Sequence, residues 1–264
     1  MTPARPALPL RALIPNAITM LALSSGATGV RFAIAGEFDK AGAAIVIAAL
    51  LDGVDGRVAR LLKGTSRFGA ELDSLSDVTA FGLAPALILY LWALSDLGQL
   101  GWVVALLYAV CCALRLARFN ASIDEDALPK KKLGFTTGVP APAGAGLALA
   151  PLFFSLGTAG MWADNPHQRA VITAIVVTLA GLAMVSPLAG WSWQSVRVPR
   201  DARVLVLLAV GLFAALLAQS PWLTLFSLSA LYGLSFPLAT LAYKKRRQAL
   251  LSPPGEAARV PESG

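Results

Sequence analysis

The chain has 264 residues, of which 56% are hydrophobic and only 14% are charged. Soluble domains average about 25% charged residues, so this composition excludes an ordinary water-soluble globular protein and indicates a membrane protein. The net charge of +7 would suit nucleic-acid binding, but the basic residues gather in short connections between apolar segments. We therefore expect no nucleic-acid partner.

Apolar segments follow one another along almost the whole chain, and a membrane-spanning helix needs about 20 such residues. Eight segments qualify, the fourth and seventh being short: residues 13–35, 41–62, 72–94, 100–116, 139–156, 171–188, 204–218 and 221–243. The prediction is an all-α, polytopic membrane protein with about eight transmembrane helices. Residues 10–247 are expected to form a single transmembrane domain, between disordered tails at residues 1–9 and 248–264.

Basic residues mark alternate connections between these segments, and Lys and Arg favour the cytoplasmic side during insertion. One side carries only Lys40 and Arg169, with Arg31 near a helix end. The other side carries Arg5, Arg11, Lys63, Arg67, Lys130 to Lys132, Arg197, Arg200, Arg203 and residues 244–247. This asymmetry predicts that both termini are cytoplasmic. Basic clusters at that interface also attract anionic head groups, so membrane lipids are expected partners.

Four aspartates lie where apolar helices would otherwise continue. Asp52 and Asp55 end the second segment and share a helix face, since they are three residues apart. Asp73 and Asp77 begin the third segment and are four apart. The short connection makes the two helices antiparallel neighbours, so the carboxylates can face one another. Four converging carboxylates would repel unless cations lie between them, and oxygen ligands suit Mg²⁺ or Mn²⁺, here two ions.

A simpler interpretation is an interfacial ion network between the aspartates and nearby basic side chains. Its candidate cations are Arg57, Arg60, Lys63 and Arg67. Against this, small residues lie in register with the aspartates: Gly56 and Ala59 on one helix and Gly69 on the other. Small residues leave room for a ligand and let helices approach closely. Arg60 follows them, at a point where a guanidinium can hold a phosphate.

The complete pattern is Asp52-x-x-Asp55-Gly56-x-x-Ala59-Arg60, then eight residues, then Gly69-x-x-x-Asp73-x-x-x-Asp77. It resembles the signature of the CDP-alcohol phosphotransferase family. The resemblance implies a helical membrane fold, a pair of divalent metal ions and a CDP-linked substrate. It assigns Asp52, Asp55, Asp73 and Asp77 to the metal site, and makes Asp77 the candidate general base.

The same resemblance suggests which residues bind the CDP-linked lipid. Pro15-Asn16-x-x-Thr19 is similar to the family's P-N-x-x-T element near the substrate pyrophosphate. Gly56 and Ala59 would accommodate the cytidine. The full set expected to bind the CDP-lipid is Pro15, Asn16, Thr19, Gly56, Ala59, Arg60 and Gly69.

Two further segments resemble the membrane-embedded bacterial phosphatidylserine synthases within that family. Arg115-x-x-Arg118-Phe119-Asn120 matches their R-x-x-R-F-N segment. Residues 135–142 resemble their F-x-G-L-P-x-P element, with Val139 in place of Leu and one extra residue before Gly138. The resemblance implies transfer of a phosphatidyl group from CDP-diacylglycerol to L-serine by a homodimer in a bacterial inner membrane, with the active site facing the cytoplasm. The candidate acceptor-binding residues are Arg115, Arg118, Asn120 and Lys132.

Other interpretations stay open at this point. Phosphatidylglycerophosphate synthase, or another CDP-alcohol phosphotransferase, would share the aspartates and differ in the acceptor. Arg115 and Arg118 could simply anchor a helix end at the interface. An ion-coupled transporter would also place carboxylates in a membrane. Transporter sites usually lie near the midplane in repeated halves, whereas these aspartates cluster at one interface and no internal repeat is evident.

Overall fold

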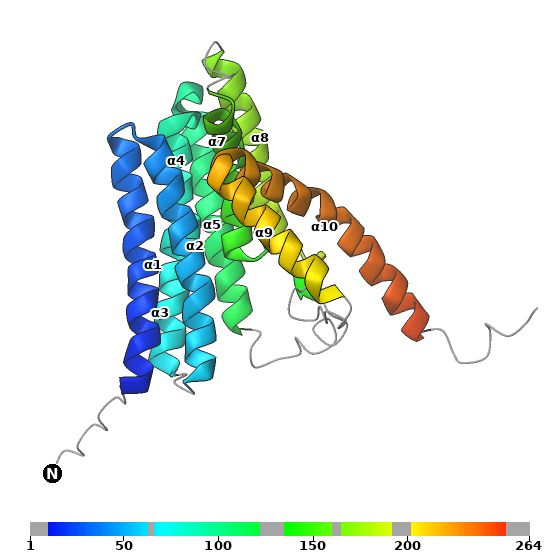
Figure 1. Ribbon diagram of the computed structural model, residues 1–264. Coiled ribbons are helices and arrows are strands. Elements are labelled where there is room, and N and C mark those ends of the chain that lie inside the picture. The colour runs from blue at the N-terminus through cyan, green and yellow to red at the C-terminus, as the bar shows by residue number, and fades with distance from the viewer. Residues whose placement is uncertain (1–9, 63–65, 122–134, 160–164, 192–201, 252–264) are drawn as a thin grey trace, which may run out of the picture.

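A computed structural model describes residues 10–62, 66–121, 135–159, 165–191 and 202–251 (Figure 1). All eight predicted segments are helical there. The elements are α1 (Leu10–Ile34), α2 (Phe38–Leu61), α3 (Arg67–Asp77), the π-helix η1 (Val78–Leu83), α4 (Ala84–Trp92), the 3₁₀-helix η2 (Leu94–Leu97), α5 (Gln99–Ala121), β1 (Phe135–Thr137), α7 (Ala141–Gly157), α8 (Pro166–Val185), β2 (Ala189–Trp191), α9 (Arg203–Gln219) and α10 (Pro221–Leu251). The expected tail 1–9 lies outside the described residues, and so do residues 252–264 of the expected tail 248–264. The first four residues of that second tail, 248–251, are instead helical, because α10 continues to Leu251.

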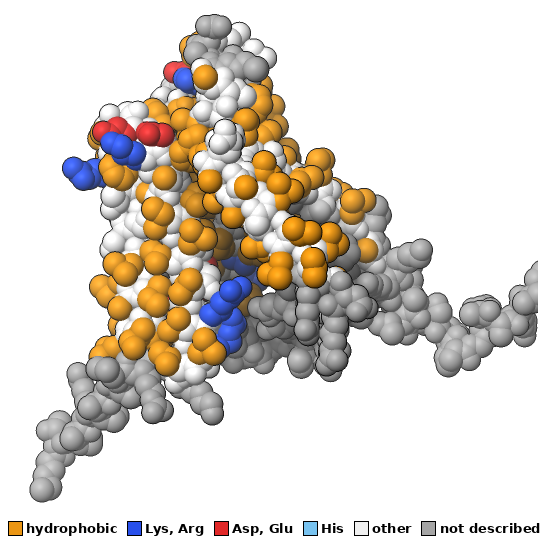
Figure 2. All heavy atoms as spheres, in the orientation of Figure 1, with side chains coloured by type: hydrophobic (Ala, Val, Ile, Leu, Met, Phe, Trp, Pro, Cys, Tyr) orange, Lys and Arg blue, Asp and Glu red, His pale blue; other side chains and the backbone are white. Residues whose placement is uncertain are grey.

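The helices have the length and surface of membrane-spanning segments. In the part of the chain that the structure describes, five are long and apolar enough to cross a bilayer: Leu13–Ile34, Arg67–Trp92, Gln99–Ala121, Pro166–Val185 and Pro221–Thr240. Helix α7 and the Val204–Gln219 part of α9 are apolar but shorter. Large apolar side chains such as Leu21, Leu50 and Val103 are exposed. Figure 2 shows many hydrophobic side chains on the visible face of the bundle. A bilayer solvates such a surface, so the chain is a polytopic integral membrane protein.

Small residues let α1 lie close to the centre of the bundle. Helix α1 packs along α2 and also contacts α3 and η1. A Cβ atom added at Gly26 would lie 2.7 Å from Ala80 Cα, so only glycine permits this approach. A Cβ atom at Gly29 would lie 3.2 Å from the Ala41 carbonyl oxygen. This close packing brings the Pro15–Thr19 part of α1 beside the ends of α2 and α3.

Residues 67–92 form one helical rod with a π-turn after Asp77. The Ala84 N–H bonds to the Thr79 carbonyl, five residues earlier, instead of the usual four. Pro85 explains the change of register, since it has no N–H to offer the Phe81 carbonyl and its ring would clash with that group. The Tyr108 hydroxyl of α5 donates to this carbonyl at 2.8 Å instead. The π-turn is therefore tied to α5 on the carboxyl-terminal side of Asp77.

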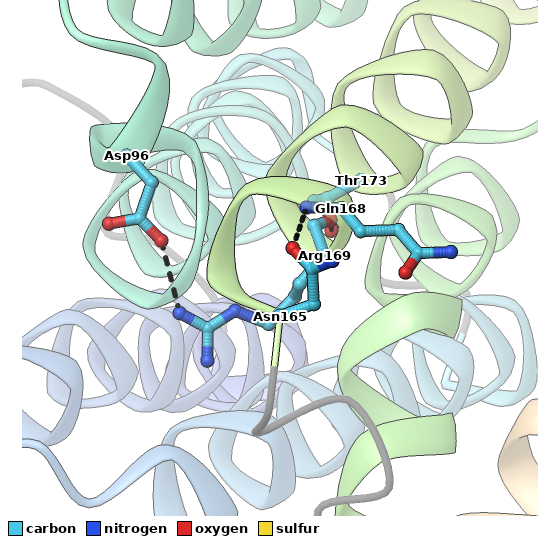
Figure 3. A network of polar contacts seen from close by, with 5 residues as sticks. All are labelled: Asp96, Asn165, Gln168, Arg169 and Thr173. Carbon is cyan, nitrogen blue, oxygen red and sulfur yellow. Dashed lines mark hydrogen bonds and ion pairs between the residues drawn. The ribbon is translucent and has the colours of Figure 1, made fainter.

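A polar contact closes the end of the bundle opposite the aspartates (Figure 3). Arg169 Nη2 of α8 lies 3.2 Å from Asp96 Oδ2 of η2, and the guanidinium lies 5.3 Å from the centroid of the Trp92 ring. The Asn165 side chain accepts a hydrogen bond from the Gln168 N–H and caps the start of α8. Two distant segments are thereby joined far from the carboxylates.

Two three-residue strands are an addition to the predicted all-helical structure. Strands β1 and β2 pair antiparallel, with Phe135 opposite Trp191. Just after β1, Gly138 has φ +69°, and a Cβ atom there would lie 2.5 Å from the Met184 carbonyl oxygen. Both the dihedral angle and the close approach require glycine at this position. Pro140 then forms the N-cap position of α7.

Candidate active site

Three carboxylates from two neighbouring helices meet at one end of the bundle. Asp52 and Asp55 lie near the end of α2, and Asp73 lies in α3. One ligand atom from each of these three residues lies within 4.8 Å of the other two. Asp55 is buried. The antiparallel arrangement expected from the short connection is present, and it gathers the three carboxylates around one point.

Asp77 lies one helical turn beyond Asp73 on α3, next to this group of carboxylates. Its carboxyl group lies next to that of Asp52, close enough for a shared hydrogen bond when one of the two is protonated, and it also interacts electrostatically with Asp73. The Arg115 guanidinium of α5 interacts with both Asp52 and Asp77. Two carboxylates in such contact must share a proton or a cation. The Asp77 carboxyl group is therefore influenced both by the acidic cluster and by the half-buried positive charge of Arg115.

Helix α1 supplies a hydrogen bond that orients the buried carboxylate. The Thr19 hydroxyl lies 2.8 Å from Asp55 Oδ2 and 3.1 Å from the Pro15 carbonyl oxygen. The Ser76 hydroxyl of α3 donates to the Thr19 carbonyl at 3.2 Å. These bonds link three helices around Asp55. They give Thr19 of the P-N-x-x-T element a definite contact within the aspartate site.

A cavity of about 270 Å³ opens beside the cluster. All seven residues predicted to bind the CDP-linked lipid line it: Pro15, Asn16, Thr19, Gly56, Ala59, Arg60 and Gly69. Asp55, Ser66, Ala70 and Asp73 complete its wall. The structure thus brings together residues that are far apart in sequence. That they bind a nucleotide-linked lipid stays a prediction.

The two motif glycines in the cavity wall have different local surroundings. A Cβ atom at Gly69 would lie 2.8 Å from Asn16 Oδ1 and 3.1 Å from Ser66 Oγ. Gly69 therefore allows α1 and α3 to approach each other. A Cβ atom at Gly56 would have no atom within 4 Å, so this glycine leaves open space in the cavity. The first glycine serves packing, and the second leaves volume for a ligand.

The structure gives the candidate acceptor-binding residues of α5 different partners. Arg115 lies beside Asp52 and Asp77. Arg118 Nη1 lies 3.3 Å from the Val185 carbonyl oxygen at the end of α8. Asn120 Nδ2 donates to Ser74 Oγ of α3 at 2.9 Å. The Arg115 charge thus acts on Asp52 and Asp77 at a distance, without a direct ion pair to either carboxylate. Lys132, the fourth candidate, lies outside the described residues.

Sequence reasoning did not single out two serines that support the site. Ser66 caps α3, where its hydroxyl accepts a hydrogen bond from the Gly69 N–H at 3.0 Å, and it also lines the cavity. Serine immediately before a helix is a readable N-cap signal. Ser74 receives the Asn120 amide, and its position between Asp73 and Asp77 was the only hint available in the sequence.

The residue types in the cluster fit a divalent metal ion. Aspartate oxygens are hard ligands that Mg²⁺ and Mn²⁺ prefer, and three ligand atoms already converge without any change of backbone. A cation there would also offset the repulsion between the carboxylates. Such an ion can bind phosphate oxygens and neutralise the charge that develops during phosphoryl transfer.

Comparison with known proteins gives a consistent result. The sequence model of the CDP-alcohol phosphatidyltransferase family matches residues 12–228. The chain is 38% identical over 231 residues to the CDP-diacylglycerol–serine O-phosphatidyltransferase of Mycobacterium leprae, covering 86% of this chain and 74% of the relative. It is 32% identical over 239 residues to the protein of the same name from Helicobacter pylori, covering 90% and 97%.

These matches decide between the classes of protein that the sequence left open. The family match spans all the helices that carry the aspartates, the cavity wall and Arg115. It therefore favours a transferase over an ion-coupled transporter. The protein is an integral membrane enzyme, and it belongs to the CDP-alcohol phosphatidyltransferase family.

Proposed function

We propose that this enzyme transfers the phosphatidyl group of CDP-diacylglycerol to the hydroxyl of L-serine, giving phosphatidylserine and CMP. The observation that carries the proposal is that the Asp77 carboxyl group interacts both with Asp52 and Asp73 of the acidic cluster and with the half-buried Arg115. Serine as the acceptor is supported by the names of the relatives from Mycobacterium leprae and Mycobacterium tuberculosis.

The cavity beside Asp55 and Asp73 takes the head group of the donor lipid. The space left by Gly56 accommodates the cytidine, and Arg60 in the wall attracts the pyrophosphate. The acyl chains stay in the bilayer beside the apolar outer faces of α1 and α2. Because the donor lipid reaches the cavity laterally from the membrane, its acyl chains do not have to leave the bilayer.

Asp52, Asp55 and Asp73, with Asp77 beside them, hold Mg²⁺ or Mn²⁺, and two such ions fit the number of carboxylates. A bound divalent cation supplies neutralisation of the pyrophosphate charge. The Thr19 hydroxyl keeps Asp55 Oδ2 in a fixed orientation. The carboxylate positions are thereby set by helix packing and hydrogen bonds before substrate arrives.

Asp77 acts as the general base in the chemical step. Its carboxylate takes the proton of the serine hydroxyl, and the serine oxygen forms a bond to the phosphorus that carries diacylglycerol. The bond from that phosphorus to the oxygen of CMP breaks, and CMP leaves with the electron pair. The proton taken from the serine hydroxyl stays on Asp77 until the products leave, and it then passes to water.

Arg115 binds the carboxylate of serine, because its guanidinium lies beside Asp77. Arg118 and Asn120 complete the acceptor side through the shape and charge of the same helix end, and Lys132 stays a candidate from the sequence alone. A cytoplasmic active site agrees with the charge asymmetry of the connections. A homodimer in a bacterial inner membrane is what the resemblance implies.

The test is release of CMP from CDP-diacylglycerol by the purified protein in detergent with Mg²⁺ or Mn²⁺. L-serine, glycerol 3-phosphate and inositol phosphate are compared in parallel as acceptors. The expected result is release that depends on serine and stops when EDTA removes the metal. Release with glycerol 3-phosphate alone would instead make the enzyme a phosphatidylglycerophosphate synthase. Release with serine that continues in EDTA would contradict the metal site.

A further inference from the structure

Two buried polar atoms on different helices have no hydrogen-bond partner among the described residues. They are Arg115 Nε on α5 and the Tyr232 hydroxyl on α10. A third such atom, Arg169 Nε, belongs to the contact at the opposite end of the bundle. Buried polar groups are nearly always paired, so unpaired ones need an explanation.

The two groups lie near each other and near the proposed base. The Arg115 guanidinium interacts electrostatically with Tyr232, Asp52 and Asp77. The Tyr232 ring is partly buried and packs against the hydrophobic core. Helix α10, which carries Tyr232, contacts α7 and β2. The Tyr232 side chain therefore lies on the side of α10 that packs into the bundle, close enough to Arg115 for an electrostatic interaction.

The chemistry of the two atoms indicates what they bind. Arg115 Nε–H can only donate a hydrogen bond, and the Tyr232 hydroxyl can donate one as well. They do not satisfy each other. Leaving both buried without partners costs free energy, which a ligand with two acceptor oxygens would recover. A carboxylate has two such acceptor oxygens. The neutral Tyr232 hydroxyl would strengthen the binding of a carboxylate without placing a second positive charge beside the metal ligands.

We infer that the Tyr232 hydroxyl and Arg115 Nε form a two-point site for the carboxylate of the acceptor, so that Tyr232 determines acceptor specificity. The inference deepens the proposed function and rests on it. It adds a residue from the carboxyl-terminal helix to a site otherwise built from α1, α2, α3 and α5. Nothing in the sequence around Tyr232 pointed to this role, because the pairing depends on how α10 packs.

The inference is tested with Tyr232→Phe, which removes only the hydroxyl. We expect KM for L-serine to rise about tenfold, which corresponds to about 1.4 kcal/mol. KM for CDP-diacylglycerol and the thermal unfolding midpoint should stay at wild-type values. Serinol has a hydroxymethyl group in place of the carboxylate, so its inhibition constant against serine should not change in the variant.

Tyr90→Phe is the matched control. Tyr90 lies in α4, where its ring packs edge-on against Trp102 with centroids 5.2 Å apart. The same chemical change there should leave both KM values at wild type. A double variant with Arg115→Gln gives a second readout, since two groups that hold one carboxylate should show non-additive effects on KM for serine.

The outcomes separate the inference from the proposed function. Serine-dependent release by the wild type together with an unchanged KM for serine in Tyr232→Phe would overturn the inference alone. A rise in KM for CDP-diacylglycerol only would also overturn it, because the anion would then be the donor pyrophosphate. Absence of serine-dependent release by the wild type would instead overturn the proposed function.

Discussion

The Thr19 hydroxyl lies 2.8 Å from Asp55 Oδ2, and this bond connects the first helix to the acidic cluster formed by the second and third. The carboxylate is buried, so a charge-assisted hydrogen bond is a main determinant of its orientation. Helix α1 can make this contact because Gly26 and Gly69 allow it to lie close to η1 and α3. The packing of small residues thus sets the geometry of a proposed metal ligand.

Replacing Thr19 with valine should weaken metal binding more than folding. Valine keeps the shape of threonine but cannot donate to Asp55, so the carboxylate loses its fixed orientation. We expect the Mn²⁺ concentration for half-maximal CMP release to rise about tenfold, as is typical when a partner of a metal ligand is removed. Thr19→Ser keeps a hydroxyl and should restore most of the affinity. An unchanged metal requirement in Thr19→Val would show that this bond does not orient the ligand.

Gly56 and Gly53 offer a matched test of the ligand space. Both are exposed positions of α2 where an added Cβ atom would meet no atom within 4 Å, but only Gly56 lines the cavity. Alanine in a helix is favoured over glycine by about 1 kcal/mol, so neither variant should lose stability. We expect Gly56→Ala to raise KM for CDP-diacylglycerol severalfold and Gly53→Ala to leave it unchanged. Equal effects of the two substitutions on KM would argue against cytidine binding beside Gly56.

Tyr108→Phe should destabilise the π-turn that follows Asp77. The substitution leaves the Phe81 carbonyl buried without its donor, and Pro85 cannot replace it. Such a loss typically costs about 1–3 kcal/mol. We expect a lower thermal unfolding midpoint in detergent, with Tyr90→Phe as the control that stays at wild type. A midpoint equal to that of the wild type would mean that the turn does not depend on this hydrogen bond.

Arg115 and Arg118 should respond differently to substitution by glutamine. Arg115 faces the aspartates, whereas Arg118 reaches the Val185 carbonyl at the end of α8. Arg115→Gln is therefore expected to raise KM for serine more than Arg118→Gln does. Steady-state kinetics over a range of serine concentrations measures the difference. A larger effect from Arg118→Gln would move the carboxylate site toward the end of α8.

Much of the fold could be predicted because hydropathy and motif spacing are local properties of the chain. The eight helical segments follow from apolar runs, and the antiparallel placement of Asp52 and Asp73 follows from the short connection between their helices. The paired strands β1 and β2 were not predicted, since each is only three residues long and depends on a partner far away in sequence.

The parts of the site that escaped prediction depend on contacts between distant segments. Pro85 was a local sign of an irregular helix, but its effect on the register after Asp77 depends on Tyr108 of another helix. Tyr232 has no motif of its own, and it becomes notable only because α10 brings its hydroxyl near Arg115. The motif residues of the cavity were found from sequence because the family signature preserves their spacing.

The most direct measurement is incorporation of isotopically labelled L-serine into lipid by the purified enzyme, comparing wild type with Asp77→Asn. The amide keeps the size of the carboxylate but cannot accept the serine proton as a base. We expect labelled phosphatidylserine from the wild type and nearly none from Asp77→Asn, which should stay folded and still bind Mn²⁺ through Asp52, Asp55 and Asp73. Labelling by Asp77→Asn at the wild-type rate would contradict the role of Asp77, and no labelled lipid from the wild type would contradict serine as the acceptor.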